Sequence, residues 1–332
     1  MASGFTVLTN EHLLRTNIWD RSLKQLLLDD LMAMDKGGLV KLLTDFPDGV
    51  TLNIPSLGEA ETADFSEGSA VKYNKMDTGN FTFSFDQYKY SANAMSAKFK
   101  RDSFYSQEVL NAFLPRQHRA LMEAVEVRVF DRMNAGQTAS NANSINGADH
   151  RYIGSAVSGT NRAMGLNDFA KAQFALMKAN VPLTGLCAVV DPSVAYTIAT
   201  QANVVNVLTP NPKWGPVVNN GLTSGLVTGS MKFMFNIYGF DVYVSNYLPT
   251  VGAETINGVS SAAGAVANYM FSAAGGDVCP IVGGFRQQPT VFSEWNKDLQ
   301  QWEYLTIAEY GFKAYRPENI VTVITDTTGV VV

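Results

Sequence analysis

Few side chains in this sequence have the types and spacing that metal or acid–base chemistry requires. The three histidines, His12, His118 and His150, lie too far apart along the chain to indicate a pair of metal ligands. His118 falls on the apolar face of a predicted long helix, where a packed or hydrogen-bonded histidine is commoner than a general base. The patterns GxSxG, GxxxxGK[ST], HExxH and GxGxxG do not occur. The sequence therefore predicts no catalytic, cofactor or metal site.

Two pairs of carboxylates could exchange protons if they were buried together. Asp29 and Asp30 fall in the later turns of a predicted amphipathic helix, and Glu59 and Glu61 fall in a polar loop. Both settings favour solvated surface groups or salt bridges between subunits over an acid–base pair.

Phe81, Phe83 and Phe85 alternate with polar residues and could form a platform on which bases stack. No basic residue lies among them, so we expect a packed strand face instead.

The composition indicates a folded protein that needs no covalent staples. Hydrophobic residues make up 46% and charged residues 17% of the chain, a balance typical of a folded protein. The length of 332 residues suits about two domains. The net charge of −5 argues against a dedicated DNA-binding protein. Cys187 and Cys279 indicate neither a disulfide framework nor a zinc site. We expect neither a signal peptide nor a membrane span.

Charge is unevenly distributed along the chain. Residues 184–285 carry six charged side chains among 102, whereas the other 230 residues carry 49. Cores of protein interfaces are depleted of charge in the same way. This segment is therefore a candidate for contact with other copies or partners.

Hydrophobic periodicity places the elements that surround these residues. One apolar stripe predicts a helix near the N-terminus: Trp19, Leu23, Leu27, Leu31 and Met34. Alternation over 51–54 and 80–86 predicts a two-stranded arm with a polar tip, ending in a bend between Phe85 and Tyr88.

A long helix is predicted over 102–133, with Leu114, His118, Leu121, Val125, Val129 and Met133 on one face. Pro115 predicts a kink or a restart in it. Its outer face mixes charges, with Arg119 and Glu123 spaced as an i,i+4 pair.

Residues 134–165 are predicted as a long loop. A helix over 166–179 follows, with Phe169, Ala172, Phe174 and Met177 on one face. The remaining predictions are a buried strand over 186–190, a helix over 193–201, and strands over 231–237, 241–245, 269–273, 301–308 and 320–325.

The order of these elements resembles the major capsid protein of tailed bacteriophages, with the short-tailed type among the alternatives. Four stretches carry the resemblance: LCAVVDPS (186–193), GFDVYVSNYLP (239–249), VGGF (282–285) and EYGFKAYRPENIV (309–321). It implies an α+β capsid fold in five segments. These are an N-terminal arm (1–50), an extended β-hairpin loop (51–95), a peripheral domain with a spine helix (96–165 and 286–332) and an axial α/β domain (166–285).

The function implied by this resemblance is self-assembly of pentamers and hexamers into an icosahedral head shell around double-stranded DNA, bound without sequence specificity. The implied partners are a portal, a separate scaffolding protein and, optionally, a decoration protein, with assembly in the bacterial cytoplasm and a final place in the virion. No enzyme activity, cofactor or membrane is implied. Intersubunit contacts are expected at Asp64, Glu67, Lys72, Lys75, Arg116, Arg119, Trp214 and Arg316.

The sequence departs from some members of this family. It shows no long scaffolding extension at its N-terminus, and nothing singles out an asparagine to crosslink with Lys72 or Lys75. Two alternatives stay open. One is an encapsulin-type shell that holds enzymes instead of DNA, and the other is an α/β enzyme built on 166–285.

Overall fold

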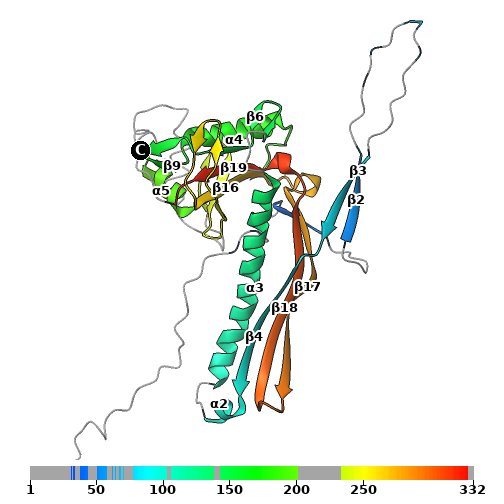
Figure 1. The fold of residues 1–332 in the computed structure, drawn as a ribbon, viewed down its shortest axis with the longest axis vertical. Helices are drawn as coiled ribbons and strands as arrows, with labels where there is room; N and C mark the ends of the chain where they lie inside the picture. The colour runs from blue at the N-terminus through cyan, green and yellow to red at the C-terminus, as the bar shows by residue number, and fades with distance from the viewer. Residues whose placement is uncertain are drawn as a thin grey trace, which may run out of the picture.

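A computed structural model describes residues 31, 33, 38–43, 51–57, 62, 64, 67–68, 70, 78–102, 106–137, 143–200 and 233–327. It shows an elongated molecule in which the long helix α3 (Ser106–Gly136) lies along a narrow sheet (Figure 1). An α/β body caps one end of the helix, and a two-stranded arm projects from the side of the sheet near that end.

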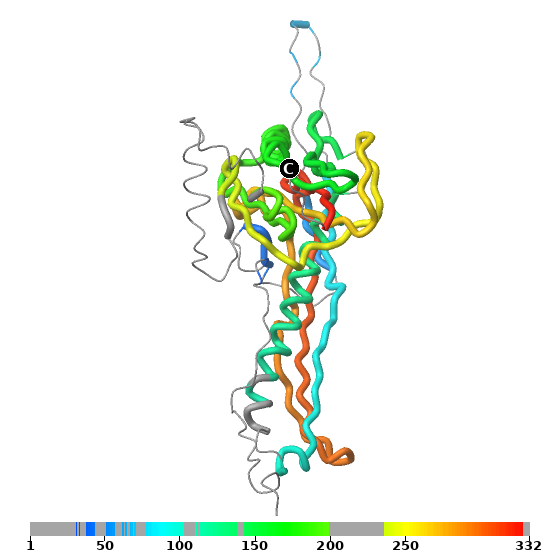
Figure 2. Tube along the Cα trace, turned by 90° about the vertical axis from the view of Figure 1, so that its left-hand side faces the viewer, coloured from blue at the N-terminus to red at the C-terminus, as the bar shows by residue number. Residues whose placement is uncertain are grey.

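The narrow sheet has four strands in the order β1-β17-β18-β4. Their bounds are Val40–Leu42 for β1, Ile281–Asn296 for β17, Gln301–Ala314 for β18 and Gln87–Ser96 for β4. β17 and β18 form a long antiparallel hairpin, and β4 pairs antiparallel with β18 along its whole length. Figure 2 shows β4 as an outer strand of this sheet, and α3 lies along one face of the sheet, in contact with β18, β4 and β17. The short helix α2 (Ala97–Asp102) follows β4 directly.

The buried face of α3 agrees with the predicted stripe except at His118. Leu121, Val125, Val129 and Met133 are buried, as expected, whereas His118 is exposed. Gln117 takes the inward position instead, and its Oε1 accepts a hydrogen bond of 3.1 Å from Thr306 Oγ1 on β18. The prediction of a packed His118 is therefore wrong: the neighbouring Gln117 is the packed residue.

The expected restart at Pro115 is also wrong. α3 runs through Pro115 without interruption, starting nine residues before it. Pro115 lies on the exposed side of the helix.

The α/β body is built on a seven-stranded sheet in the order β11-β12-β10-β16-β19-β7, with β13 also paired to β16. The bounds are Phe233–Ile237 for β11, Phe240–Val244 for β12, Leu186–Val190 for β10, Ala265–Ser272 for β16, Val321–Thr325 for β19, Arg151–Ile153 for β7 and Thr250–Val251 for β13. β7 and β19 come from outside 166–285, so this body draws on the chain before and after that range.

Alternating side chains divide this sheet between two cores. Ala188 and Val190 point toward α4 (Leu166–Lys178) and α5 (Pro192–Thr200). Cys187 and Val189 point toward the last turns of α3. There the rings of Phe130 and Tyr269 stack with centroids 6.0 Å apart. The body and the spine helix therefore share one continuous core.

Residues 134–165 are not the long loop that the sequence predicted. They contain short strands: β5 (Ser144–Ile145), β6 (Ala148–Asp149), β7, β8 (Ala156–Ser158) and β9 (Asn161–Ala163). Strands of two or three residues leave too few positions for a period of two to show. β5 pairs with β6 and β8 pairs with β9 in short local hairpins, whereas β7 pairs with the distant β19.

The packed face of α4 is also rotated from the predicted one. Phe169 and Ala172 are buried as expected, but Ala175 and Leu176 complete the face. Phe174 and Met177 are 50% and 56% exposed. Two further short strands, β14 (Thr255–Ile256) and β15 (Val259–Ser260), and two short 3-10 helices, η2 (Gly276–Val278) and η3 (Pro317–Asn319), complete the described elements.

The projecting arm consists of β2 (Thr51–Leu57) and β3 (Thr78–Ser84), paired antiparallel as predicted. The predicted bend falls at residues 85–86, between β3 and β4. Most of the predicted helix over 17–34 lies outside the described residues. Leu31 and Ala33 are described and are not helical, and the Ala33 amide donates to Glu126 Oε2 at 2.7 Å.

Candidate assembly surfaces

The root of the arm is held against the narrow sheet by close packing. Phe83 is fully buried, and Gly311 of β18 passes so near that an added Cβ would lie 2.5 Å from the Ser84 carbonyl oxygen. Lys313 Nζ donates to the Thr82 carbonyl at 2.8 Å and lies 4.6 Å from the Phe81 ring centroid. This agrees with the packed strand face that the sequence predicted.

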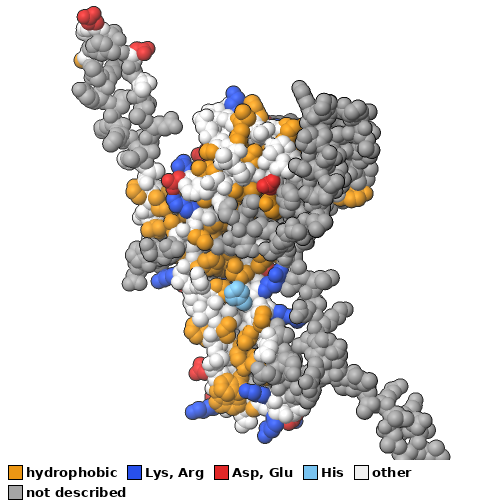
Figure 3. Space-filling model, turned by 180° about the vertical axis from the view of Figure 1, so that it is seen from behind, with side chains coloured by type: hydrophobic (Ala, Val, Ile, Leu, Met, Phe, Trp, Pro, Cys, Tyr) orange, Lys and Arg blue, Asp and Glu red, His pale blue; other side chains and the backbone are white. Residues whose placement is uncertain are grey.

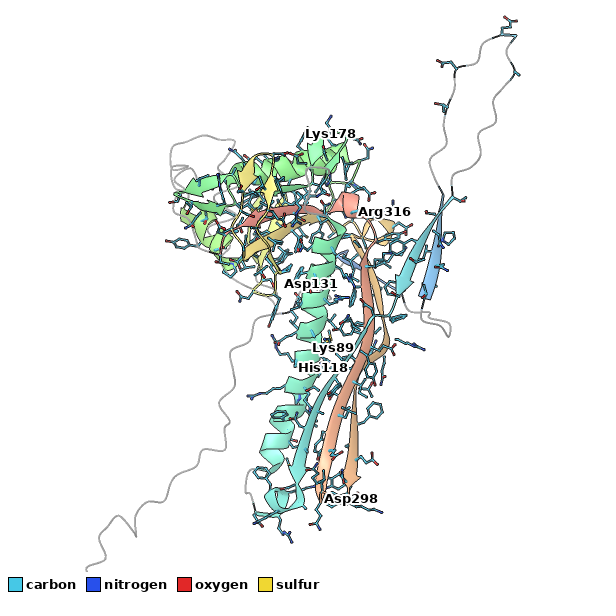
Figure 4. All side chains as sticks on the ribbon, viewed as in Figure 1. Lys89, His118, Asp131, Lys178, Asp298 and Arg316 are labelled. Carbon is cyan, nitrogen blue, oxygen red and sulfur yellow. The ribbon has the colours of Figure 1, made fainter. Side chains whose placement is uncertain are left out.

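An ion-pair cluster fixes the bend between β3 and β4. Arg128 and Arg132 of α3 both donate to Asp86 Oδ2. Burial by itself raises the pKa of Asp86, but the hydrogen bonds and charges of the two arginines outweigh it and lower that pKa below its usual value. Asp131 lies on the same helix (Figure 4), and burial raises the pKa of its carboxyl. The cluster ties the direction of the arm to the spine helix.

Beyond this root the arm extends away from the molecule. Asp64 and Glu67 lie in its outer part and are exposed, and the space-filling view shows acidic side chains at its end (Figure 3). Lys72, Lys75 and Trp214 lie outside the described residues. Asp64 and Glu67 thus lie away from the other predicted contact residues that the structure describes, Arg116, Arg119 and Arg316.

Arg119 occupies the outer face of α3, as predicted. Its Nε donates to Glu123 Oε1 at 3.2 Å, and the same oxygen accepts from the Tyr247 hydroxyl at 3.0 Å. The pair therefore links the spine helix to the segment after β12. Arg116 lies one turn earlier and is half-buried.

Arg316 lies where β18 meets the α/β body (Figure 4). Its Nε donates to the Asp277 carbonyl at 3.2 Å, and its guanidinium lies 5.3 Å from the Tyr315 ring centroid. The exposed Asp277 carboxylate pairs with Lys41. Its pKa is lowered, first by the hydrogen bond from Lys41. Arg316 thus has contacts within its own copy, and none of these contacts joins it to Asp64, Glu67, Arg116 or Arg119, the other predicted contact residues that the structure describes.

Sequence reasoning missed the buried ion pair that joins the spine helix to the α/β body. Arg151 Nη2 lies 2.6 Å from Glu254 Oε1, and the two side chains are 2% and 11% exposed. Arg151 Nη1 also donates to Asn134 Oδ1 at 2.9 Å and to the Gln137 carbonyl, both at the end of α3. A cation at a helix C-terminus is favourably placed. No periodic pattern could reveal this pair, because its members are 103 residues apart.

Within the described ranges, the structure shows no group of three or more metal-ligating side chains. No described helix is long and apolar enough to cross a membrane. One cavity of about 450 Å³ lies between α3 and the end of β4, with Phe99, Phe113 and Leu114 among its lining residues.

Comparison with known proteins identifies the family of this chain. Residues 89–323, well over half of the chain, match the family model described as phage capsid protein. The chain belongs to the phage capsid protein family. The match runs from β4 to β19 and so includes the spine helix, the long hairpin and the α/β body. The resemblance seen in the sequence is confirmed.

Solved capsid structures share this fold over nearly the whole length of both chains. The capsid of cyanophage P-SCSP1u is 14% identical with a TM-score of 0.68, over 95% of this chain and 93% of that one. The capsid of cyanophage Pam1 is 12% identical with a TM-score of 0.65, over 99% and 100%. A chain of Mycobacterium phage Che8 is 16% identical with a TM-score of 0.64, over 92% and 95%. No curated protein sequence matches the chain.

The family match and the capsid neighbours together show a major capsid protein that forms a shell and is a component of the virion.

Proposed function

We propose that copies of this capsid protein assemble as hexamers and pentamers into an icosahedral head that encloses double-stranded DNA. The observation that carries this proposal is the arm β2–β3, whose root is clamped while its outer part leaves its own copy. A two-stranded arm is marginally stable alone and needs a surface to lie on. In a shell, that surface belongs to the neighbouring subunit.

We assign different segments of the chain to different contacts between copies. We assign the charge-poor segment 184–285 to contacts around the axis of each hexamer or pentamer, because interface cores are depleted of charge. We assign the segments 96–165 and 286–332 to the peripheral region, except for β7 and β19, which belong to the sheet of the α/β body. We also assign residues 1–50 to an N-terminal arm, of which β1 pairs with β17 of its own copy.

The charge of the chain fits a container for DNA. Strong binding to phosphate would hold the DNA in place, whereas an acidic protein with a net charge of −5 lets it enter and leave. The proposed partners are a portal, a separate scaffolding protein and, optionally, a decoration protein, with assembly in the cytoplasm of the host bacterium. The packaged DNA is bound without sequence specificity.

Deletion of residues 56–79 tests this role of the arm. The variant keeps the clamped root, so we expect a folded subunit with the wild-type circular dichroism spectrum that forms no shells in the electron microscope. As a milder variant, Glu67→Lys with Lys72→Glu should lower the yield of shells more than the melting temperature. Normal shells from the deletion variant would contradict the assignment of the arm.

The content of purified particles separates this proposal from an encapsulin-type compartment. We expect nuclease-protected double-stranded DNA in particles purified from infected cells. Particles that contain a cargo enzyme and no DNA would favour the compartment instead.

A further inference from the structure

The strand β4 leaves one long edge of the narrow sheet open. It is the last strand in the order β1-β17-β18-β4, and among the described residues no strand pairs with its other edge. Its ten residues contain no proline, and Lys89 is the only charged one. Soluble proteins usually protect such an edge with prolines, several charges or a bulge, because its free backbone groups recruit other strands.

Side chains along β4 alternate between the two faces of the sheet. The odd-numbered residues turn toward α3, because Ser91 pairs with Thr306, whose hydroxyl donates to Gln117 of that helix. The even-numbered residues face away from the helix, and Tyr88 and Tyr90 are 62% and 68% exposed. Large apolar rings therefore stand exposed beside the open edge.

The same exposed face continues into the neighbouring strands. Tyr90 pairs with Ile307 of β18, and Ala92 pairs with Leu305, which in turn pairs with Phe292 of β17. Phe292 is 48% exposed. An apolar face next to an unpaired edge is the arrangement expected of a strand that completes its sheet in the assembly.

We propose that β4 of one copy pairs antiparallel with β4 of a second copy across a two-fold axis, so that two four-stranded sheets become one. This inference rests on the proposed function, because the shell supplies the second copy. Contacts of this self-complementary kind are the usual way in which two identical chains meet.

The register of β4 suits pairing with itself. In an antiparallel pair about Ser91 or Ala92, even-numbered residues lie opposite even-numbered ones, so both copies of α3 fall on the same side of the joined sheet. A shell requires this, because all its subunits must present the same face inward. Lys89 then lies opposite Asn93 or Met95 of the second copy, and no like charges meet.

Single cysteines test the pairing in assembled shells. The native Cys187 and Cys279 are buried, so Ser91→Cys and Ala92→Cys each introduce one accessible thiol. Directly opposite residues of an antiparallel pair have Cα atoms about 4.5–5.5 Å apart, within the range that a disulfide spans. We expect mild oxidation of shells to convert most of one of these variants into a disulfide-linked dimer. The control is Ala120→Cys on the exposed side of α3, which should stay monomeric on a non-reducing gel.

Hydrogen exchange on the wild-type protein gives a second measurement that needs no variant. The backbone amides of 87–96 should exchange at least about tenfold more slowly in shells than in free subunits, because pairing supplies the missing partners. Shells that show neither the disulfide nor this protection would overturn the inference and leave the proposed function intact. A disulfide from Ala92→Cys to Asn53→Cys would also overturn it, because the arm of a neighbour would then occupy the edge. Failure of the wild-type protein to form shells with its scaffolding protein would instead count against the proposed function.

Discussion

Gly311 and Asp86 hold the root of the arm by two different kinds of contact. Gly311 allows the backbones of β18 and β3 to approach, and Asp86 gathers two arginines of the spine helix at the bend. The sequence predicted the arm and its bend, because alternation is local. It could not single out these two residues, because Asp86 is 42 residues from Arg128 and Gly311 is still farther from Ser84.

Gly311→Ala should loosen the root of the arm. The added Cβ would lie 2.5 Å from the Ser84 oxygen, and relief requires the backbones to move apart. Overpacking of this kind costs about 1–3 kcal/mol of unfolding free energy, which a urea denaturation curve would measure. The control is Gly252→Ala, whose Cβ would meet nothing within 4 Å. Equal stability of the two variants would contradict the close approach.

Asp86→Asn should reduce stability in a pH-dependent way. The folded pKa of Asp86 lies below its unfolded value, so its contribution is present above the unfolded pKa, near 4, and is lost as pH falls through the folded pKa. We expect the variant to melt below the wild type at pH 7 and to approach it under acid conditions. Asp298→Asn, at the exposed turn between β17 and β18, is the control. A melting difference that does not change with pH would count against this ion-pair cluster.

At the scale of elements, the long helix α3 was predicted, but the long strands β4 and β17 and the short strands β5 to β9 were not. The strand 186–190 and the helix after it were correct, because a buried run followed by Asp191-Pro192 is a strong local signal. The packed face of α4 was misjudged because its outer stripe also carries Phe174 and Met177. Strands β5 to β9 have only two or three residues each, too few for a periodic pattern, and β7 also depends on the distant β19.

The junction between the spine helix and the α/β body makes a prediction at this scale. Glu254→Leu alone should cost about 3–5 kcal/mol of unfolding free energy, because it leaves the buried Arg151 without its carboxylate. The double variant Arg151→Met with Glu254→Leu should cost clearly less, since no buried charge is left unpaired. Urea denaturation of both variants measures the difference. A double variant as unstable as the sum of the two single ones would show that the pair is not coupled.

At the scale of the whole molecule, the chain combines a continuous core with surfaces that one copy leaves open. The spine helix contacts both the narrow sheet and the α/β body, so these parts form one framework. The clamped arm and the free edge of β4 both extend from that framework without cover among the described residues. The resemblance in the sequence predicted a framework with a projecting arm. Only the structure shows that the outer edge of β4 has no partner among the described strands.

The mass and shape of the purified capsid protein test the central claim most directly. Light scattering and negative-stain electron microscopy would be applied to the same sample, expressed alone and together with its scaffolding protein. We expect pentamers, hexamers or closed shells, because the arm and the charge-poor segment need partners that only other copies supply. A strict monomer or dimer at every concentration, with and without the scaffolding protein, would contradict assembly as the function of this chain.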